Sequence, residues 1–315
     1  MTMNGYIVVA GGINVDIKGK AFSSMDIGSS NPGIIEISPG GVGRNIAHNL
    51  ALLNVPVVLL SAVGSDAQGL KALHEASESG VCTDHVLRAD DSITGTYIAL
   101  LDSRGEMTAA LSDMRILEKL DSDYFKTKLE VLQKASYIIC DANLPCPAIE
   151  FIISTANNCR IPVCLEPVSV KKALKLKNCL KGIDFITPNL DELAALAGMD
   201  THRDKAEPMA AQLIKSGVLN VITTLGKEGL CHTNAEGSKY FQSIPTTVTD
   251  VTGAGDALTA GFFYGLMKYG SIDKALICGL AAAAVTIGSK ETVSPLMSED
   301  KIRELSTLYS LHNML

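Results

Sequence analysis

The segment DVTGAGDALTAGF, residues 250–262, places two glycines and an alanine between two aspartates and then continues as an apolar helical pattern. The small side chains of Gly253, Ala254 and Gly255 let main-chain N–H groups come close to an anion, and the start of the following helix adds positive partial charge. Asp256 stands at the head of that helix, where we expect a carboxylate to stay ionised and to accept a proton from an attacking hydroxyl. The pattern predicts transfer of a phosphoryl group. The structural alternative is a helix start in which Asp256 serves only as the N-cap.

A second polar segment, TPNLDE at 187–192, ends a buried apolar run and opens a helical pattern. It is expected to present Asn189 and Glu192 near the same edge of the molecule as the first segment. Glu192 suits a magnesium ion held through water, because Mg2+ dehydrates reluctantly and keeps part of its water shell. The structural alternative is a helix cap followed by a first-turn acid.

A third segment, TTLGKEG at 223–229, ends another apolar run in a glycine-rich turn. Gly226, Lys227 and Gly229 are suited to the phosphates of a nucleotide, and a plain hairpin turn is the structural alternative. Each of the three segments is a weak signal alone. Their common edge and their order along the chain make them strong together.

The other end of the predicted cleft starts with INVD, which ends at Asp16 and leaves the first apolar run. Asp16 can accept hydrogen bonds from two neighbouring sugar hydroxyls, so we assign it and Asn14 to the substrate. The glycine turn PGGVGRN supplies backbone N–H groups at Gly41 and the amide of Asn45 to the same sugar. The alternatives are a strand-end turn for Asp16 and a polar position in the first helical turn for Asn45.

Continuous apolar runs recur along the chain: YIVVAG at 6, VVLLSAV at 57, YIICDA at 137, PVCLEPV at 162, DFITPN at 184 and VITTLG at 221. Runs without in-out alternation are typical of strands that are covered on both faces of a mainly parallel sheet. Helical patterns lie between them. The sequence therefore predicts a doubly wound α/β fold in one domain, residues 1–315.

Two segments interrupt this rhythm, residues 15–38 and 94–111, and both show β-type alternation. They are predicted to form a small β-sheet that covers the carboxyl edge of the large sheet as a lid. The apolar face of the lid would contain Ile35, Ile37, Ile98 and Leu100. We expect a homodimer through this face; the alternative is a monomer in which substrate and the large sheet cover it.

The composition favours a small-molecule partner. The chain has 315 residues, is 47% hydrophobic and 19% charged, and carries a formal net charge of −7. The absence of a basic cluster argues against nucleic acid, and the absence of a membrane-length apolar run or a signal peptide leads us to expect a cytoplasmic location without a membrane partner. Eight cysteines without a C-x-x-C pair indicate a reducing compartment, and six histidines without an H-E-x-x-H motif argue against a histidine metal site.

Four motifs occur in order: GGINVD at 11–16, PGGVGRN at 39–45, NLDE at 189–192 and DVTGAGD at 250–256. In this order they resemble the ribokinase-like (PfkB) carbohydrate kinases, and the resemblance covers essentially the whole chain. It implies the ribokinase-like fold with its small lid. It also implies an ATP-dependent transfer of phosphate to an alcohol group.

The resemblance assigns roles to matching residues. By it, the catalytic base is Asp256, and the anion hole is formed by Gly253, Ala254 and Gly255. Asn189 and Glu192 would contact the metal and the phosphates of ATP. Thr224 and Gly226 would line the ATP site. Asp250 and Thr252 match positions that in many members help to hold an activating K+, together with carbonyls. The remaining K+ ligands would come from GSKETV, residues 288–293, which matches the family poorly.

A narrower resemblance lies on the substrate side. SNPGIIEISPGGVGRNIAHNLALL at 30–53, with SAVGSD at 61–66 and SDM at 112–114, looks most like the pseudouridine kinases within the family. This resemblance implies phosphorylation of the 5′-hydroxyl of pseudouridine. Asn143 is expected to point into the cleft beside the transferred phosphate or to cap the helix that follows. The lid residues nominated to read uracil, or else to face solvent, are Ser30, Asn31 and Thr96, with Asp113 as a further candidate.

Two other functions stay open at this point. One is a different kinase of the family, acting on ribose, another nucleoside or a hexose phosphate, although the lid lacks a basic pair for a second phosphate. The other is a ligand-binding regulator that kept the fold and lost catalysis. Asp256 and the intact glycine segment argue against a regulator.

Overall fold

The computed structural model describes residues 5–202 and 205–312, and an eight-stranded sheet forms its centre. The strand order is β14-β13-β12-β11-β10-β9-β1-β4, parallel from β4 to β12, with β13 and β14 added antiparallel at one edge. The strands are β1 (Ile7–Ala10), β4 (Val57–Leu60), β9 (Tyr137–Asp141), β10 (Val163–Glu166), β11 (Phe185–Ile186), β12 (Asn220–Thr224), β13 (Leu230–Asn234) and β14 (Gly237–Phe241). The predicted mainly parallel α/β sheet is confirmed.

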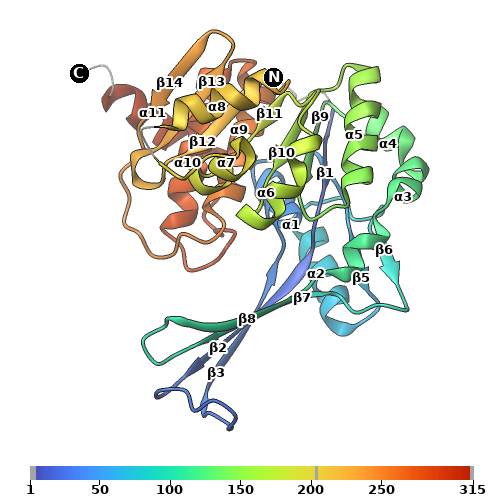
Figure 1. The fold of residues 1–315 in the computed structure, drawn as a ribbon, viewed down its shortest axis with the longest axis vertical. Coiled ribbons are helices and arrows are strands. Elements are labelled where there is room, and N and C mark those ends of the chain that lie inside the picture. Colours follow the sequence, from blue (N-terminus) through green and yellow to red (C-terminus); the bar gives the residue numbers. More distant parts are fainter. Residues whose placement is uncertain (1–4, 203–204, 313–315) are drawn as a thin grey trace.

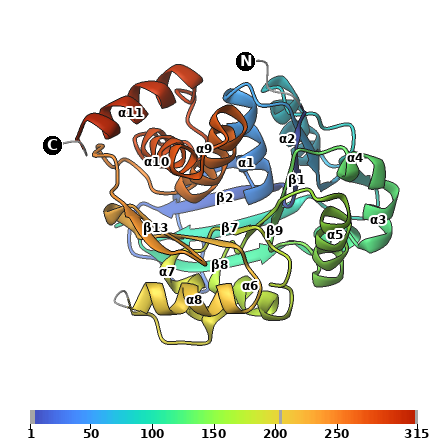
Figure 2. The same cartoon turned by 90° about the horizontal axis from the view of Figure 1, so that it is seen from above.

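Helices cover both faces of this sheet (Figure 2). One face is covered by α1 (Val42–Leu52), α2 (Ala67–Glu78), α9 (Ala254–Tyr269), α10 (Ile272–Ile287) and α11 (Glu299–His312). The other is covered by α3 (Ser122–Thr127), α4 (Leu129–Gln133), α5 (Cys146–Cys159), α6 (Val170–Lys175), α7 (Leu190–Ala197) and α8 (Ala206–Lys215). None of the described helices combines the length and the apolarity needed to cross a membrane.

Two apolar cores lie between the sheet and these helices. In β1, Ile7 and Val9 point into the core that contains α1, α9 and α10, whereas Val8 and Ala10 point into the core that contains α5 and α7. All four side chains are fully buried. Because both faces of the sheet are covered, its strands need apolar residues at successive positions, which explains the absence of in-out alternation.

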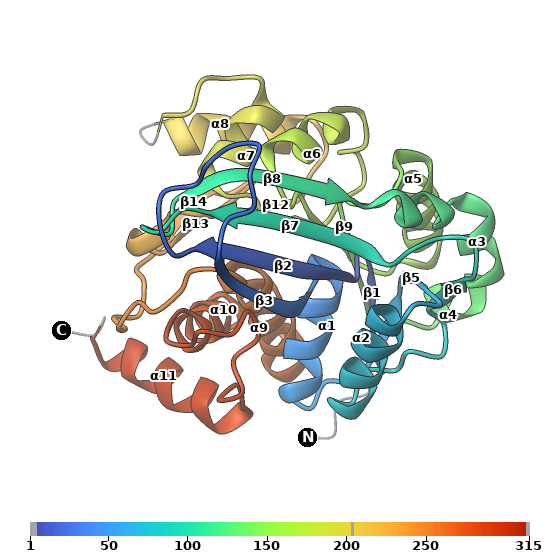
Figure 3. The same ribbon diagram turned by 90° about the horizontal axis from the view of Figure 1, so that it is seen from below.

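A four-stranded sheet, the lid, projects from this body (Figures 1 and 3). Its order is β3-β2-β7-β8, and its strands are β2 (Asn14–Ala21), β3 (Gly33–Gly40), β7 (Gly95–Leu101) and β8 (Met107–Asp113). These strands correspond to residues 15–38 and 94–111, the two segments predicted to interrupt the alternation of strands and helices. Only three residues separate β1 from β2, so the lid is joined directly to the large sheet at its second strand from the β4 edge.

One apolar run divides into two strands. VVLLSAV forms β4 and then β5 (Ala62–Gly64), and β5 pairs with β6 (Leu87–Ala89) in a separate two-stranded sheet. The break falls at Ser61, whose carbonyl accepts the N–H of Leu87 at 2.8 Å. Composition alone did not reveal the break, because the apolar pattern continues through it.

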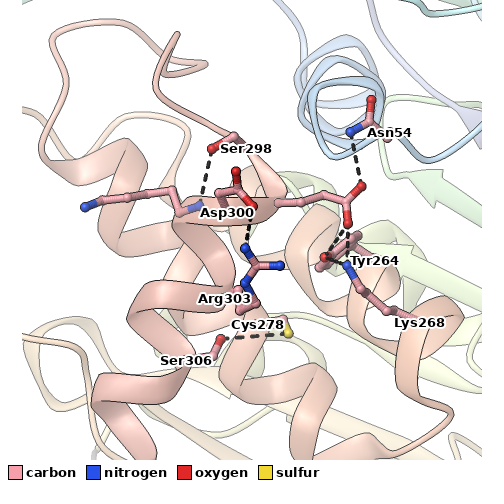
Figure 4. A network of polar contacts seen from close by, with 10 residues as sticks. Asn54, Tyr264, Lys268, Cys278, Ser298, Asp300, Arg303 and Ser306 are labelled. Carbon is pink, nitrogen blue, oxygen red and sulfur yellow. Dashed lines mark hydrogen bonds and ion pairs between the residues drawn. The ribbon is translucent and has the colours of Figure 1, made fainter.

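Helix α11 anchors the far end of α9 (Figure 4). Glu299, at the start of α11, accepts hydrogen bonds from Asn54 and from the hydroxyl of Tyr264, each at 3.1 Å. Lys268 of α9 forms an ion pair with the same carboxylate. The opposite end of α9 carries Asp256, so the predicted base lies on a helix that is fixed at its other end.

Candidate active site

Asp256 lies buried in the first turn of α9. Its Oδ2 accepts a hydrogen bond from Nδ2 of Asn45, on α1, at 2.8 Å. Burial raises the pKa of Asp256 to about 7; the Asn45 hydrogen bond and the charge of Arg44 oppose this, whereas the charges of Asp141 and Asp16 add to it. The expectation of a carboxylate kept ionised by the helix end is corrected, because desolvation outweighs that effect. A carboxyl with a pKa near 7 is matched to exchange a proton at neutral pH.

The glycine-rich turn before this residue is tight on one side and open on the other. Gly253 has a φ of 80°, and a Cβ there would lie 2.2 Å from the carbonyl oxygen of Thr292, so the turn requires glycine. The N–H of Ala254 is already used, because it donates to the Val251 carbonyl at 3.2 Å. A Cβ on Gly255 would meet nothing within 4 Å, and the Gly255 N–H has no acceptor in the described part of the chain. The N–H of Gly253 likewise has no acceptor there, so Gly253 and Gly255 both offer free donors to the predicted anion hole.

The predicted sugar contacts gather where β2, β3 and α1 meet. Asn14 Nδ2 donates to Asp16 Oδ1 at 2.6 Å. Opposite Asn14, a Cβ on Gly40 would lie 2.4 Å from Asp16 Oδ2, so glycine leaves room for the carboxylate. Gly41, the next residue, is the N-cap of α1. Burial raises the pKa of Asp16, and its charge acts on Asp256, which places the two carboxyl groups at the same site.

Asp141, at the end of β9, joins three chain segments, and sequence analysis missed it. Its Oδ2 accepts the N–H of Gly12 at 2.7 Å and of Gly43 at 3.0 Å, and its Oδ1 accepts the N–H of Asn143 at 2.8 Å. A Cβ on Gly43 would lie 2.8 Å from the backbone of Gly11, so α1 starts in direct contact with the link between β1 and β2. The available signal was an acid at the end of the apolar run YIICD.

Asn143 lies beside this junction and does not cap the next helix. The N-cap residue of α5 is Pro145, and no side chain caps that helix. Lys172, on α6, donates from Nζ to Asn143 Oδ1. Burial lowers the pKa of Lys172, and the charge of Asp141 opposes that effect. Lys172 is a second residue that sequence analysis did not single out, since nothing in its local pattern indicates burial.

Asn189 and Glu192 form a reciprocal cap at the start of α7. Asn189 Oδ1 accepts the Glu192 N–H at 2.9 Å, and Glu192 Oε2 accepts the Asn189 N–H at 2.9 Å. The helix cap that was expected as the structural alternative is therefore present. The cap uses one side-chain oxygen of each residue, and within the described chain it leaves Glu192 Oε1 and Asn189 Nδ2 for a ligand.

Three carboxyl groups lie close together at the ends of β10, α7 and α9. Burial raises the pKa of Glu166 well above its usual range, and the charges of Glu192 and Asp256 raise it further. Carboxylate oxygens are ligands that Mg2+ prefers, and Glu192 Oε1 is left open by the helix cap, so Glu192 fits Mg2+. The described residues hold no group of three acidic, histidine or cysteine side chains able to bind a metal by themselves. A metal ion at this position would therefore be coordinated by water and nucleotide oxygens as well as by Glu192.

The predicted nucleotide loop follows β12. Thr224 forms a parallel bridge with Asn189, so these two residues are neighbours. Gly226 and Lys227 lie in an exposed 3-10 turn (Gly226–Glu228) that connects the antiparallel strands β12 and β13. This segment is therefore a hairpin turn, as the structural alternative expected. A Cβ on Gly226 would meet no atom within 4 Å, whereas one on Gly229 would lie 2.0 Å from a backbone oxygen of β14. Gly226 leaves open space, and Gly229 is required for packing.

The two segments assigned to K+ lie side by side. Asp250 Oδ1 accepts the N–H of Thr252 at 2.8 Å and its hydroxyl at 2.7 Å. The N–H groups of Thr249 and Asp250 donate to the carbonyl of Ile287, at 2.8 and 3.3 Å. The Thr249 hydroxyl donates to the carbonyl of Gly288 at 3.3 Å, and the Thr292 carbonyl lies against Gly253, so residues 288–293 run beside this loop.

The strand register divides the lid into two faces. Asp16 is paired with Tyr97 in β7, and Tyr97 with Ser112 in β8, so these three residues share the face toward the site. Thr96 is paired with Asp113, and both lie on the opposite face. Thr96 and Asp113, which were nominated for the base, therefore lie on the face away from Asp16, whereas Tyr97 and Ser112 lie on the face of Asp16. An offset of one residue in a strand reverses the face to which a side chain points.

Ser30 and Asn31 lie in the loop 22–32 between β2 and β3, at the outer end of the lid (Figure 1). The Asn31 side chain accepts the N–H of Asp26 at 2.8 Å and donates to the carbonyls of Asp26 and Ser29 at 3.1 Å. Ser30 is exposed. Because Asp16 lies near the start of β2 and this loop follows its end, the structure does not bring these two residues to the sugar contacts.

A doubly wound sheet with a β lid, and a glycine-rich helix start beside a buried carboxyl, define a small-molecule kinase. Residues 4–299 match the pfkB family carbohydrate kinase model. The chain therefore belongs to the PfkB family of carbohydrate kinases and is an ATP-dependent phosphotransferase with an alcohol group as acceptor.

The comparisons with individual proteins are consistent with this family. The chain is 38% identical over 263 residues to the pseudouridine kinase of Escherichia coli K12, covering 83% of each chain. It is 33% identical over 307 residues, 97% of this chain and 84% of the other, to an uncharacterized sugar kinase of the same strain. The solved structure of Arabidopsis thaliana ribokinase complexed with ribose and ATP matches with a TM-score of 0.85 and 24% identity, over 96% of this chain and 99% of that one. The ribokinase-like fold is confirmed.

Proposed function

We propose that this kinase transfers the γ-phosphoryl group of ATP to the 5′-hydroxyl of pseudouridine and forms pseudouridine 5′-phosphate. The observation that carries the proposal is the 38% identity to the pseudouridine kinase of Escherichia coli K12, over 83% of each chain. An open cavity of about 750 Å³ lies beside the proposed sugar contacts, and Met114 and Asn143 are among its lining residues. Met114 lies against the base of the lid, since a Cβ on Gly95 would be 3.0 Å from its Sδ, and Asn143 lies against Gly12.

The proposed reaction uses the carboxyl groups at the two ends of the site. Asp16 and Asn14 hold the ribose hydroxyls and direct the 5′-oxygen toward Asp256. Asp256 takes the hydroxyl proton while the 5′-oxygen bonds to the γ-phosphorus and the bond from that phosphorus to the β,γ-bridging oxygen breaks. ADP leaves with the electron pair of the broken bond. The Gly255 N–H and the N-terminus of α9 stabilise the charge on the group in transfer.

The nucleotide is proposed to lie between α7 and the loop after β12. Asn189 and Glu192 would contact its phosphates and Mg2+, and Thr224, Gly226, Lys227 and Gly229 would line the rest of its site. When bound, Mg2+ neutralises negative charge on the β- and γ-phosphate oxygens. The open space at Gly255 and Gly226 supports this placement, because a ligand can approach the backbone closely there.

The base is proposed to be read from the lid face that carries Tyr97 and Ser112. Pseudouridine has a second ring N–H that uridine lacks, so an acceptor such as the Ser112 hydroxyl loses its partner with uridine. An unpaired polar group costs about 1–3 kcal/mol, which corresponds to about 5- to 150-fold in kcat/KM. Replacement of Ser112 by alanine should reduce the preference for pseudouridine and leave the KM for ATP unchanged.

Steady-state rates of ADP release with pseudouridine, uridine and ribose test the substrate assignment. We expect the highest kcat/KM with pseudouridine. Equal kcat/KM with ribose would remove the nucleoside assignment, and a preference for uridine would make the protein a nucleoside kinase of another specificity. The Asp256→Asn variant is the control for background hydrolysis of ATP.

We propose in addition that K+ activates the enzyme through the loop at Asp250 and the carbonyls of 288–293. The contacts of both segments with the end of α10 support this proposal. Replacing KCl by NaCl at equal ionic strength should lower kcat. Equal kcat in the two salts would contradict it.

We propose that two copies of the chain associate through the lid face opposite Asp16. Ile35, Ile37, Leu100 and Leu111 share this face by register and are 71%, 50%, 38% and 75% exposed. Exposed apolar surface of this kind favours a self-complementary interface. Sedimentation equilibrium should show a dimer that Ile37→Lys dissociates and that Glu36→Lys, on the other face, leaves intact. A wild-type monomer at micromolar concentration would contradict this proposal.

A further inference from the structure

Arg44, on α1, is nearly fully buried beside the site, and no step of the proposed reaction uses it. Only 4% of its surface is exposed. Its Nη1 donates to Asn45 Oδ1 at 2.9 Å and to the Pro39 carbonyl at 3.5 Å, and its Nε has no partner in the described chain. A buried guanidinium is costly to desolvate, so its position beside Asn45 calls for a functional explanation.

Asn45 stands between a group that can only donate and a group that, when ionised, can only accept. A guanidinium carries no acceptor, and a carboxylate carries no donor. The amide therefore satisfies both neighbours in a single orientation, with Oδ1 toward Arg44 and Nδ2 toward Asp256. The opposite orientation would place Oδ1 against the Asp256 carboxylate and the amide nitrogen against the guanidinium.

We propose that Arg44 is a positioning residue that fixes the Asn45 amide with Nδ2 toward Asp256, and so keeps the Asp256 carboxylate ready to accept the substrate proton. Without Arg44, the amide can turn and accept the proton of a neutral Asp256. That hydrogen bond would stabilise the form of Asp256 that cannot act as a base. The inference rests on the proposed role of Asp256 as the catalytic base.

The charged groups around Asp256 come from several elements. Asp141 of β9 and Asp16 of β2 raise its pKa, Arg44 lowers it, and Glu166 of β10 interacts with it as well. The charge of Arg44 therefore acts in the same direction as its hydrogen bond. Loss of Arg44 should raise the pKa of Asp256 through both effects.

Two further groups face Arg44 itself. Burial lowers the pKa of Arg44, and Glu75 of α2 is the first of the charges that oppose this effect. His48, one turn along α1, has a pKa lowered to about 4 by burial and by Arg44, so it is neutral in the range of the assay. Asp16 also senses Arg44. For that reason the pH profile is measured on kcat, which reports the substrate complex in which sugar hydroxyls occupy Asp16.

The experiment compares Arg44→Met with Arg44→Lys, using the best acceptor found for the wild type. Arg44→Met removes the charge and the donor, and Arg44→Lys keeps one of each. In the wild type, kcat should fall on the acid side of its pH profile as Asp256 becomes protonated; we call this fall the acid limb. We expect the midpoint of the acid limb to lie about one pH unit higher in Arg44→Met, with the KM for ATP within about twofold of wild type. In Arg44→Lys the limb should stay within about 0.3 pH units of the wild-type position.

An unmoved acid limb in Arg44→Met, with a kcat that is lowered equally at every pH, overturns the inference, because that is the signature of a structural role. If Arg44→Met does not fold, Arg44→Gln replaces it, since glutamine lacks the charge and its amide can donate or accept, so it no longer fixes the orientation of Asn45. Its limb should lie above that of Arg44→Lys, and coincident limbs would overturn the inference. A wild-type profile without an acid limb, or full turnover in Asp256→Asn, refutes the base role of Asp256 instead.

Discussion

Replacing Asp256 by asparagine should stabilise the folded protein at neutral and alkaline pH. The pKa of this carboxyl is raised from 3.8 to about 7, chiefly by burial. Between these two values the folded protein binds one proton that the unfolded chain has lost. Stability contributed by a raised carboxyl pKa is lost as the pH rises, here by about 1.4 kcal/mol per pH unit up to a plateau of about 4 kcal/mol above pH 7. Asparagine is neutral at every pH and avoids this loss.

Urea unfolding of wild type and Asp256→Asn at pH 4.5, 7 and 8.5, without nucleotide, measures the effect. The variant should be more stable by about 1 kcal/mol at the lowest pH and by about 4 kcal/mol at the highest. Exposed Asp200 provides the matched control, since Asp200→Asn removes the same charge without a buried site. A difference between wild type and Asp256→Asn that does not change with pH would refute the reasoning. Turnover in Asp256→Asn should meanwhile fall by about 10²- to 10⁴-fold.

Three further predictions concern the same site. The kcat/KM of the wild type should fall about tenfold per pH unit below about 7, as protonation removes the base, and a flat profile down to pH 6 would contradict the raised pKa of Asp256. Gly255→Ala should keep the melting temperature of the wild type, because the added Cβ meets no protein atom within 4 Å, but should lose at least about tenfold in kcat/KM for ATP; full activity would show that no phosphate approaches there. Asp141→Asn should lose about 1–3 kcal/mol in urea unfolding, because one of its oxygens ceases to accept, and should move the acid limb to lower pH; an unmoved limb would contradict the charge effect of Asp141 on Asp256.

Sequence analysis located the elements whose signals are local. The apolar runs of β1, β9 and β10 show burial on both faces by composition alone, and the glycine-rich start of α9 is contiguous in the chain. The lid strands were found within a few residues, because alternation marks them. The alanine-rich helix α10 was not singled out, since its residues are apolar all round and show no polar face.

Long-range geometry could not be predicted in the same way. Asp141 accepts hydrogen bonds from Gly43 and Gly12, which precede it in the sequence by 98 and 129 positions. Nothing in the sequence near Asp141 indicates these two partners. The choice between Thr96 and Tyr97 depends on a strand register that shifts face with every residue. The raised pKa of Asp256 arises from burial under several elements, so a local helix-end argument could not predict that this carboxyl titrates near neutral pH.

The carboxylate of Asp141 gathers the link that leads into the lid and the first turn of α1, which carries Arg44 and Asn45. The connection before β2 and the first turn of α1 are thus held by one carboxylate oxygen. Any displacement of β2 at the Gly11–Ile13 connection would act on the hydrogen bonds that hold the start of α1, and with it Asn45, the hydrogen-bond donor to Asp256.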